Sequence, residues 1–180
     1  GTYRQKCADV AASGYSGFFF GNVNAAADVE GRLAVGGNLT SGFDVGYRNA
    51  HGSSAPSLVV GGHASLTSPW GYAGSIYNGP SYQTNTNASI GPAAAEWLPG
   101  RVRAGDIVYG SSLTATSWQY GSAVQNAGYL DFAAAKAQLS GLSAQLSAAS
   151  ANGTWSLAAG GVSLVGDGVS DVQIFKLGTT

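Results

Sequence analysis

The sequence predicts a mainly β fold: an irregular β-solenoid (β-helix) with one long α-helix, residues 131–150, packed along its side. Two observations support this. Short apolar runs recur along the chain and end in glycine, and a single segment rich in alanine and leucine lacks internal proline. No proline- or serine-rich linker divides the 180 residues, so residues 1–180 are expected to form one domain. An ordinary β-sandwich is the alternative fold.

The recurring apolar runs predict stacked strands. Residues 33–40 read LAVGGNLT and residues 58–65 read LVVGGHAS, with looser echoes at residues 107–114 and 163–168. A β-branched run that ends in glycine is typical of a strand entering a tight corner. Repeats of this length indicate stacked units, none of which buries its apolar face alone. Their uneven spacing favours an irregular solenoid.

Residues 131–150 are predicted to form the helix. Asp131 suits the N-cap, and Asn152 with Gly153 suits the C-terminal stop. The apolar side chains recur at steps of three and four and form one stripe: Phe132, Ala135, Leu139, Leu142 and Leu146. Polar residues occupy the opposite face, so the stripe is expected to pack on the β body from outside. Three short strands are expected after the helix, returning to the sheet.

Residues 28–39, DVEGRLAVGGNL, resemble the opening motif of the bacterial choice-of-anchor A domains. Residues 131–143 and 164–177 are similar to that family's helix and final strands, in the same order, so the resemblance spans nearly the whole chain. It implies a secreted, cell-surface adhesin domain and supplies no catalytic or ligand residues. The layout is also similar to that of bacterial ice-binding β-solenoids.

The charge of the chain excludes several partners. Only 9% of residues are charged, the net charge is −1, and the eight basic residues are scattered. Binding to a phosphate backbone needs clustered cations, so nucleic acid is not an expected partner. No apolar run approaches the ~20 residues that span a bilayer, so no membrane insertion is expected. The abundant Gly, Ala, Ser, Thr and Asn are typical of a secreted protein of the bacterial surface.

No constellation of catalytic residues is visible, so we expect no enzyme. His51 and His63 lack the close spacing of metal ligands, and no Gly-x-Ser-x-Gly elbow lies between a strand and a helix. On a strand, Asp28 and Glu30 would share one face with Arg32. An ion pair or a turn network is therefore expected there in preference to an acid pair.

No cofactor is expected. Residues 167–171, DGVSD, offer oxygen ligands of the kind that calcium takes, without the full spacing of a calcium loop. Cys7 is the single cysteine, which leaves a buried thiol or a crosslink to another chain. Asn38, Asn87 and Asn152 begin glycosylation sequons, which matter only if the source glycosylates its secreted proteins.

The aromatic residues between positions 70 and 120 are the candidate ligand-binding residues. Several lie beside Gly, Pro, Ser or Asn, in contexts typical of loops. Exposed rings near amides and hydroxyls suit sugar rings or protein surfaces, so a carbohydrate or a host or matrix protein is the expected partner. The alternative is that the rings plug the corners of the solenoid. The candidates are Trp70, Tyr72, Tyr77, Tyr82, Trp97, Trp118 and Tyr120.

Two further functions stay open. Thr84 with Thr86 and Thr114 with Thr116 form Thr-x-Thr pairs, whose members share one face of a flat strand, as on ice-binding surfaces. Threonine is common in strands for other reasons. The second alternative is a structural domain of a surface layer without a soluble ligand.

Overall fold

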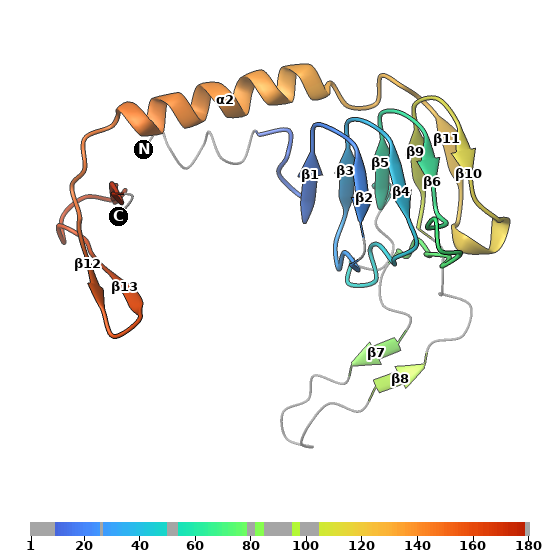
Figure 1. The fold of residues 1–180 in the computed structure, drawn as a ribbon, viewed down its shortest axis with the longest axis horizontal. Helices are drawn as coiled ribbons and strands as arrows, with labels where there is room; N and C mark the ends of the chain where they lie inside the picture. Colours follow the sequence, from blue (N-terminus) through green and yellow to red (C-terminus); the bar gives the residue numbers. More distant parts are fainter. Residues whose placement is uncertain are drawn as a thin grey trace. The chain divides into compact units, whose positions relative to one another are not determined.

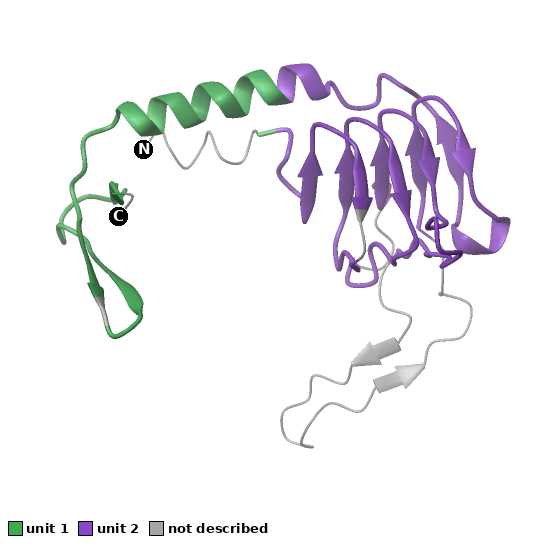
Figure 2. Ribbon diagram, viewed as in Figure 1, with its two compact units in different colours: residues 1–10, 136–180 green, residues 11–135 purple. Residues whose placement is uncertain are grey.

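The computed structural model describes residues 10–25, 27–49, 54–78, 82–84, 95–97 and 105–178. The chain is mainly β, with parallel sheets and one long helix (Figure 1). It divides into two compact units: unit 2 is Ala11–Ala135, and unit 1 is Gly1–Val10 with Lys136–Thr180 (Figure 2). Folding of residues 1–180 as one domain stays a prediction.

Unit 2 contains two parallel sheets whose strands alternate along the chain. Sheet A has the order β1 (Gly17–Phe19), β3 (Leu33–Val35), β5 (Leu58–Val60), β9 (Ile107–Tyr109) and β11 (Ala123–Gln125). Sheet B has the order β10 (Leu113–Thr114), β6 (Ala64–Ser65), β4 (Leu39–Ser41) and β2 (Val23–Ala25). Each turn of the chain therefore gives one strand to sheet A and the next to sheet B. The arrangement is consistent with an irregular β-solenoid.

The registers confirm the main sequence echo. Leu33 pairs with Leu58, and Leu39 pairs with Ala64, as the echo between residues 33–40 and 58–65 requires. Ile107 pairs with Leu58 in the next turn, which confirms the looser echo at residues 107–114. The echo at residues 163–168 is wrong, because β13 (Gly161–Val165) pairs antiparallel with β12 (Thr154–Ala158) in unit 1. The backbones of β7 (Tyr82–Thr84) and β8 (Ala95–Trp97) also pair antiparallel.

The core of unit 2 lies between the two sheets and a third row of parallel bridges that joins Val29, Val45 and Ile76. Alternate residues of each strand point inward because side chains alternate along a strand. The inward residues are Leu33, Val35, Leu58, Val60 and Ile107 from sheet A and Val23, Leu39 and Ala64 from sheet B. Each large aliphatic side chain contributes about 1.5–3 kcal/mol to the free energy of unfolding.

Glycine forms a column at the corner that follows sheet A. Gly36, Gly61 and Gly110 follow β3, β5 and β9. A Cβ on Gly61 would lie 2.5 Å from the carbonyl oxygen of Gly36, and a Cβ on Gly110 would overlap the carbonyl oxygen of Gly61. Only a residue without a side chain allows this approach of the turns.

An asparagine column joins the turns beside these glycines. The backbone N–H of Asn38 donates to Oδ1 of Asn22 (2.8 Å), and the N–H of His63 donates to Oδ1 of Asn38 (2.9 Å). Each asparagine thus satisfies a backbone donor of the following turn, which a corner would otherwise leave unpaired.

Aspartates repeat the arrangement at other corners. The N–H of Asp44 donates to Oδ1 of Asp28 (2.9 Å), and the N–H of Ser75 donates to Oδ1 of Asp44 (2.8 Å). Asp106 accepts from the N–H of Ser122 (2.9 Å). A carboxylate acceptor makes these bonds stronger than those between neutral groups.

The outer face of sheet A is apolar and covered. Its outward residues Ala34, Val59 and Val108 are buried, and Tyr15, Phe18, Leu130 and Phe132 pack on them. Phe132 opens helix α2 (Phe132–Ala148), and its ring lies 5.3 Å from that of Phe18. The first helical turn therefore packs on the β body as predicted. The predicted N-cap is confirmed, because the N–H of Ala134 donates to Oδ1 of Asp131 (2.8 Å).

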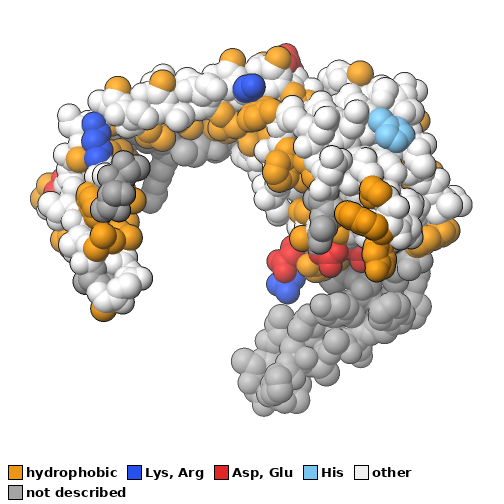
Figure 3. Space-filling view, viewed as in Figure 1, with side chains coloured by type: hydrophobic (Ala, Val, Ile, Leu, Met, Phe, Trp, Pro, Cys, Tyr) orange, Lys and Arg blue, Asp and Glu red, His pale blue; other side chains and the backbone are white. Residues whose placement is uncertain are grey.

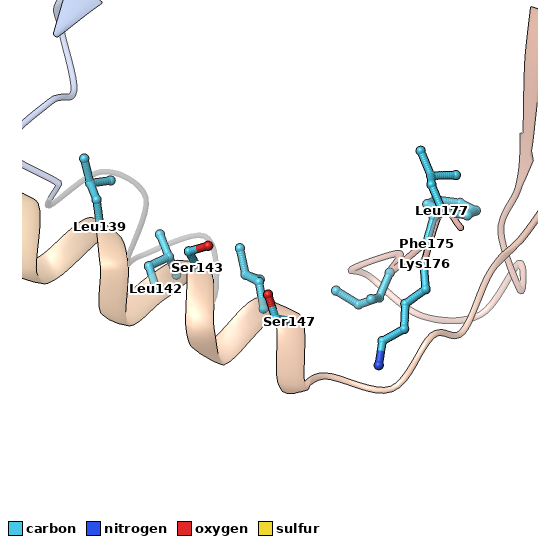
Figure 4. A pocket seen from close by; sticks show the side chains of 9 residues that line it. Leu139, Leu142, Ser143, Ser147, Phe175, Lys176 and Leu177 are labelled. Carbon is cyan, nitrogen blue, oxygen red and sulfur yellow. The ribbon is translucent and has the colours of Figure 1, made fainter. Parts of the chain in front are cut away.

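From Lys136 onward, α2 belongs to unit 1. Leu139, Leu142 and Leu146 line one side of a pocket of about 640 Å³ (Figure 4). The other side is formed by residues 174–177. Packing of the stripe on the β body beyond Ala135 stays a prediction. The expected strands after the helix are corrected: β12 and β13 pair with each other, and residues 172–177 form no strand.

The side chain of Gln119 joins the last turn of unit 2 to the preceding turn by hydrogen bonds. Gln119 ends the 3-10 helix η2 (Ser117–Gln119), and its side chain is 1% exposed. Its Nε2 donates to the carbonyl oxygens of Leu66 (3.0 Å) and Gly74 (2.6 Å), and its Oε1 accepts from the N–H of Thr116 (2.7 Å). One side chain thus joins three backbone segments in the interior.

Gln119→Glu is expected to lower the free energy of unfolding by about 3 kcal/mol, because it removes both donors and sets a buried carboxylate against two carbonyl oxygens. Gln125→Glu is the matched control. Gln125 also donates to two carbonyl oxygens, those of Gly110 (3.3 Å) and Ser111 (3.1 Å), but it is exposed. Its loss should stay within about 0.5 kcal/mol in urea unfolding. Equal losses in the two variants would contradict the role assigned to Gln119.

Candidate ligand-binding surface

Among the described residues of unit 2, the most exposed aromatic side chains lie on a short hairpin, residues 67–73, which we call the aromatic hairpin. An antiparallel bridge joins Thr67 to Ala73. The N–H of Ser68 donates to the carbonyl of Tyr72 (2.8 Å), and the N–H of Tyr72 donates to Oγ of Ser68 (3.1 Å). Gly71 takes φ +84° at the tip, a conformation that glycine adopts without strain. The hairpin backbone is therefore fixed by its own hydrogen bonds.

The aromatic hairpin presents two large rings to solvent. Trp70 is 76% exposed and Tyr72 is 71% exposed. The hairpin also packs closely on the turn at Gly42, because a Cβ on Gly42 would overlap the backbone of Tyr72. The exposure expected for these two rings is confirmed, and their positions are set by a rigid support.

A shallow pocket of about 380 Å³ lies beside the rings. It is lined by Ala27, Asp28, Gly42, Phe43, Ser68, Trp70 and Tyr72. Asp28 contributes the charge: its Oδ1 accepts from the N–H of Asp44, and its Oδ2 has no hydrogen-bond partner among the described residues. Aromatic faces beside a carboxylate acceptor can stack on a sugar ring and accept hydrogen bonds from its hydroxyls.

The other predicted aromatic residues are distributed differently. Trp118 is 48% exposed in η2. Tyr77 is not the exposed ring that was expected: it is 8% exposed, and its hydroxyl donates to Oδ2 of Asp44 (3.3 Å). Tyr120 is half-buried and packs against the core cluster. The side chains of Tyr82 and Trp97 lie outside the described residues.

The acidic motif also differs from expectation. Glu30 pairs with Arg48 (Nε to Oε1, 3.4 Å) and not with Arg32, and both partners are more than half exposed. The guanidinium of Arg32 lies 4.3 Å from the ring centre of Tyr15, and its Nε donates to the carbonyl of Pro56 (2.9 Å). Arg32 thus fixes the backbone before β5.

Among the threonine pairs, only Thr114 with Thr116 has described side chains. Thr114 lies in β10, whereas Thr116 caps η2 and its hydroxyl donates to Oε1 of Gln119 (3.0 Å). The two therefore do not share a flat strand, and this expectation is wrong for the pair.

Thr86 lies outside the described residues, as do Cys7, His51 and Asn87. Of the other sequon residues, Asn38 is exposed, and both amide atoms of Asn152 are hydrogen-bonded.

Residues 8–180 match the model of a family described as a putative ice-binding-like adhesive domain. The chain belongs to this family. No curated protein and no solved structure matches this chain. The family suggests a surface or extracellular protein. Within the described part of the chain, no helix is long and apolar enough to cross a membrane.

In this adhesive domain, the segment considered for calcium is a self-contained turn. Oδ1 of Asp167 accepts from the N–H of Val169 (3.1 Å), the N–H of Ser170 (2.9 Å) and Nε2 of Gln173 (2.8 Å), and Oδ2 accepts from Oγ of Ser170 (2.6 Å). A cation would have to displace these donors. No group of three or more His, Cys, Asp or Glu side chains that could hold a metal occurs among the described residues.

The same four donors hold the pKa of Asp167 well below its ordinary value, with the Ser170 hydroxyl as the largest cause. A depressed pKa in the folded state means that the turn is stabilised above the unfolded pKa and loses this stability only as pH falls through the folded pKa. The amide resonances of Val169 and Ser170 should therefore stay in place as pH is lowered through about 4, the ordinary range of Asp. Ser170→Ala should move the inflection toward that range. An inflection near 4 in the unaltered protein would contradict the assignment.

Proposed function

We propose that the chain is a non-catalytic, extracellular binding module that attaches a bacterial cell to a carbohydrate surface. A host or matrix protein is the alternative ligand. The single observation that supports this proposal best is the pair of exposed rings, Trp70 and Tyr72, on one rigid hairpin beside the Asp28 pocket. Membership of an adhesive domain family supports the same function.

The physical argument rests on what the two rings gain on binding. A large flat ring offers much contact area and loses few rotatable bonds when it becomes ordered. The hydrogen bonds within the hairpin have already ordered the backbone of Trp70 and Tyr72, so less conformational entropy remains to be lost. Free rings on a fixed support therefore favour a binding role over a packing role.

We further propose that unit 2 is an irregular β-solenoid of the choice-of-anchor A type. The motif at residues 28–39 supports this, because its residue types have distinct places in the stacked turns. Asp28 accepts from the next turn, residues 33–35 form β3, Gly36 stands in the glycine column and Asn38 stands in the asparagine column. The motif thus covers most of one 16-residue turn of such a solenoid.

Trp70→Ala and Tyr72→Ala are each expected to weaken carbohydrate binding by about 2 kcal/mol, the size typical of an interface hot spot. Because both rings are exposed, the melting temperature should change little. Tyr129→Ala is the matched control, since it removes an exposed ring (42%) that lies outside the aromatic hairpin. Glycan and matrix-protein arrays identify the ligand, and calorimetry then compares the variants.

Trp118→Ala is expected to weaken binding in the same direction if the surface extends to η2. A silent array would count against the adhesive function, and variants that unfold readily would show that the rings support the fold. Self-assembly of the purified chain together with a silent array would favour a structural role in a surface layer.

Ice binding is the second candidate function. The family description favours it, and the outer face of sheet B carries a regular row of polar side chains. Thermal hysteresis of the purified chain decides between the two, because a carbohydrate-binding surface produces none.

A further inference from the structure

The outer face of sheet B carries a polar side chain on every strand. The registers place Asn24 beside Thr40, Thr40 beside Ser65, and Ser65 beside Thr114. Their strand neighbours Val23, Leu39 and Ala64 point into the core, so these four point outward. They form a row that crosses all four strands.

A second polar row lies two residues earlier in each turn. It consists of Asn22, Asn38, His63 and Ser112. Hydrogen bonds link its members across the turns: Asn22 and Asn38 each accept from the following turn, and Nδ1 of His63 lies 2.6 Å from Oγ of Ser112. Nε2 of His63 reaches the first row, 3.5 Å from Oγ1 of Thr114. We call the eight residues of both rows the polar grid.

The polar grid has a fixed spacing. Parallel strands lie about 4.7–4.9 Å apart, and residues i and i+2 of a strand lie about 6.6 Å apart. Four strands are therefore separated by three equal steps, which span roughly 14 Å. No Asp, Glu, Lys or Arg occurs among the eight residues, so the grid matches a neutral ligand that carries many hydroxyls at a regular interval.

The polar grid continues into the aromatic hairpin. Gly42 lies two residues beyond Thr40, on the same side of the chain, and the backbone of Tyr72 lies directly over it. The pocket residues Ala27, Gly42 and Ser68 all follow strands of sheet B. In Figure 3 the surface over these strands is largely white, and hydrophobic side chains gather at its lower end.

We propose that the polar grid is a binding site for an extended, neutral, β-linked polysaccharide. The chain lies across the strands with about one sugar unit on each, beside Trp70 and Tyr72, since the strand spacing is close to the length of one unit in such a chain. This inference rests on the proposed function and names the class of its ligand. A polymer of alternating hydroxyls is favoured over an ice lattice, because the side chain changes from strand to strand: Asn, Thr, Ser and Thr.

The test measures binding of the full chain to the dimers and hexamers of β-1,4-linked glucose, mannose and N-acetylglucosamine by calorimetry. At least one hexamer should bind roughly tenfold more tightly than its dimer, because only the hexamer spans all four strands. Thr40→Val and Thr114→Val remove one hydroxyl each and keep the shape of the side chain. Each should lower hexamer affinity about fivefold. Thr154→Val, an exposed strand threonine of unit 1, is the matched control.

The outcomes separate this inference from the proposed function. If the dimer and the hexamer bind with equal affinity, and Trp70→Ala weakens both, the polar grid is overturned and the hairpin site is supported. Hexamer binding that depends on Thr40 and not on Trp70 would support the grid and overturn the hairpin. Absence of hexamer binding, or thermal hysteresis that Thr40→Val abolishes, would overturn the polysaccharide assignment, the latter in favour of ice. Melting temperatures close to that of the unaltered chain confirm that the variants fold.

Discussion

The close stacking of successive turns is the constraint on which the rest of unit 2 depends. At the corner after sheet A the carbonyl of one turn lies where a side chain of the next would be, so Gly36, Gly61 and Gly110 are required there. Beside them, side-chain oxygens of Asn22 and Asn38 accept the backbone donors of the following turn. Steric fit and hydrogen bonding thus fix the same register, so the position of each strand is set by its contacts with the preceding turn.

Because the register is fixed, each outer face has a defined chemistry. Outward positions of sheet A carry Ala34, Val59 and Val108, and the start of α2 removes them from water. Outward positions of sheet B carry Thr40, Ser65 and Thr114, which need no cover because hydroxyls can hydrogen-bond to solvent. A single scaffold therefore stabilises itself through one face and leaves the other available.

The sequence predicted part of this arrangement. The echo between residues 33–40 and 58–65 was visible because Gly-Gly follows an aliphatic run in both. The 16-residue interval from Asn22 to Asn38 and from Asp28 to Asp44 was missed, since the aromatic run at residues 18–20 hides the likeness to β3. The exposure of Trp70 was predicted correctly from its Pro and Gly neighbours. The exposure of Tyr77 was not, because neighbouring Ser, Asn and Gly residues also occur where a ring turns into the core. The polar grid could not be predicted, because Asn, Ser and Thr carry no signal until the register aligns them.

The interval between turns also explains where the candidate site lies. Asn22 and Asn38 are 16 residues apart, Asn38 and His63 are 25 apart, and His63 and Ser112 are 49 apart, although each pair occupies adjacent turns. The extra residues enter between sheet B and the next strand of sheet A, and the longest addition includes the aromatic hairpin. The entropic cost of closing a loop grows only slowly with its length, so a corner can accept an insertion once the flanking turns hold the register. Long insertions on a rigid frame are where binding residues concentrate. The glycine and asparagine columns that hold the turns together are thus also what allows Trp70 and Tyr72 to be presented at the edge of a flat polar face.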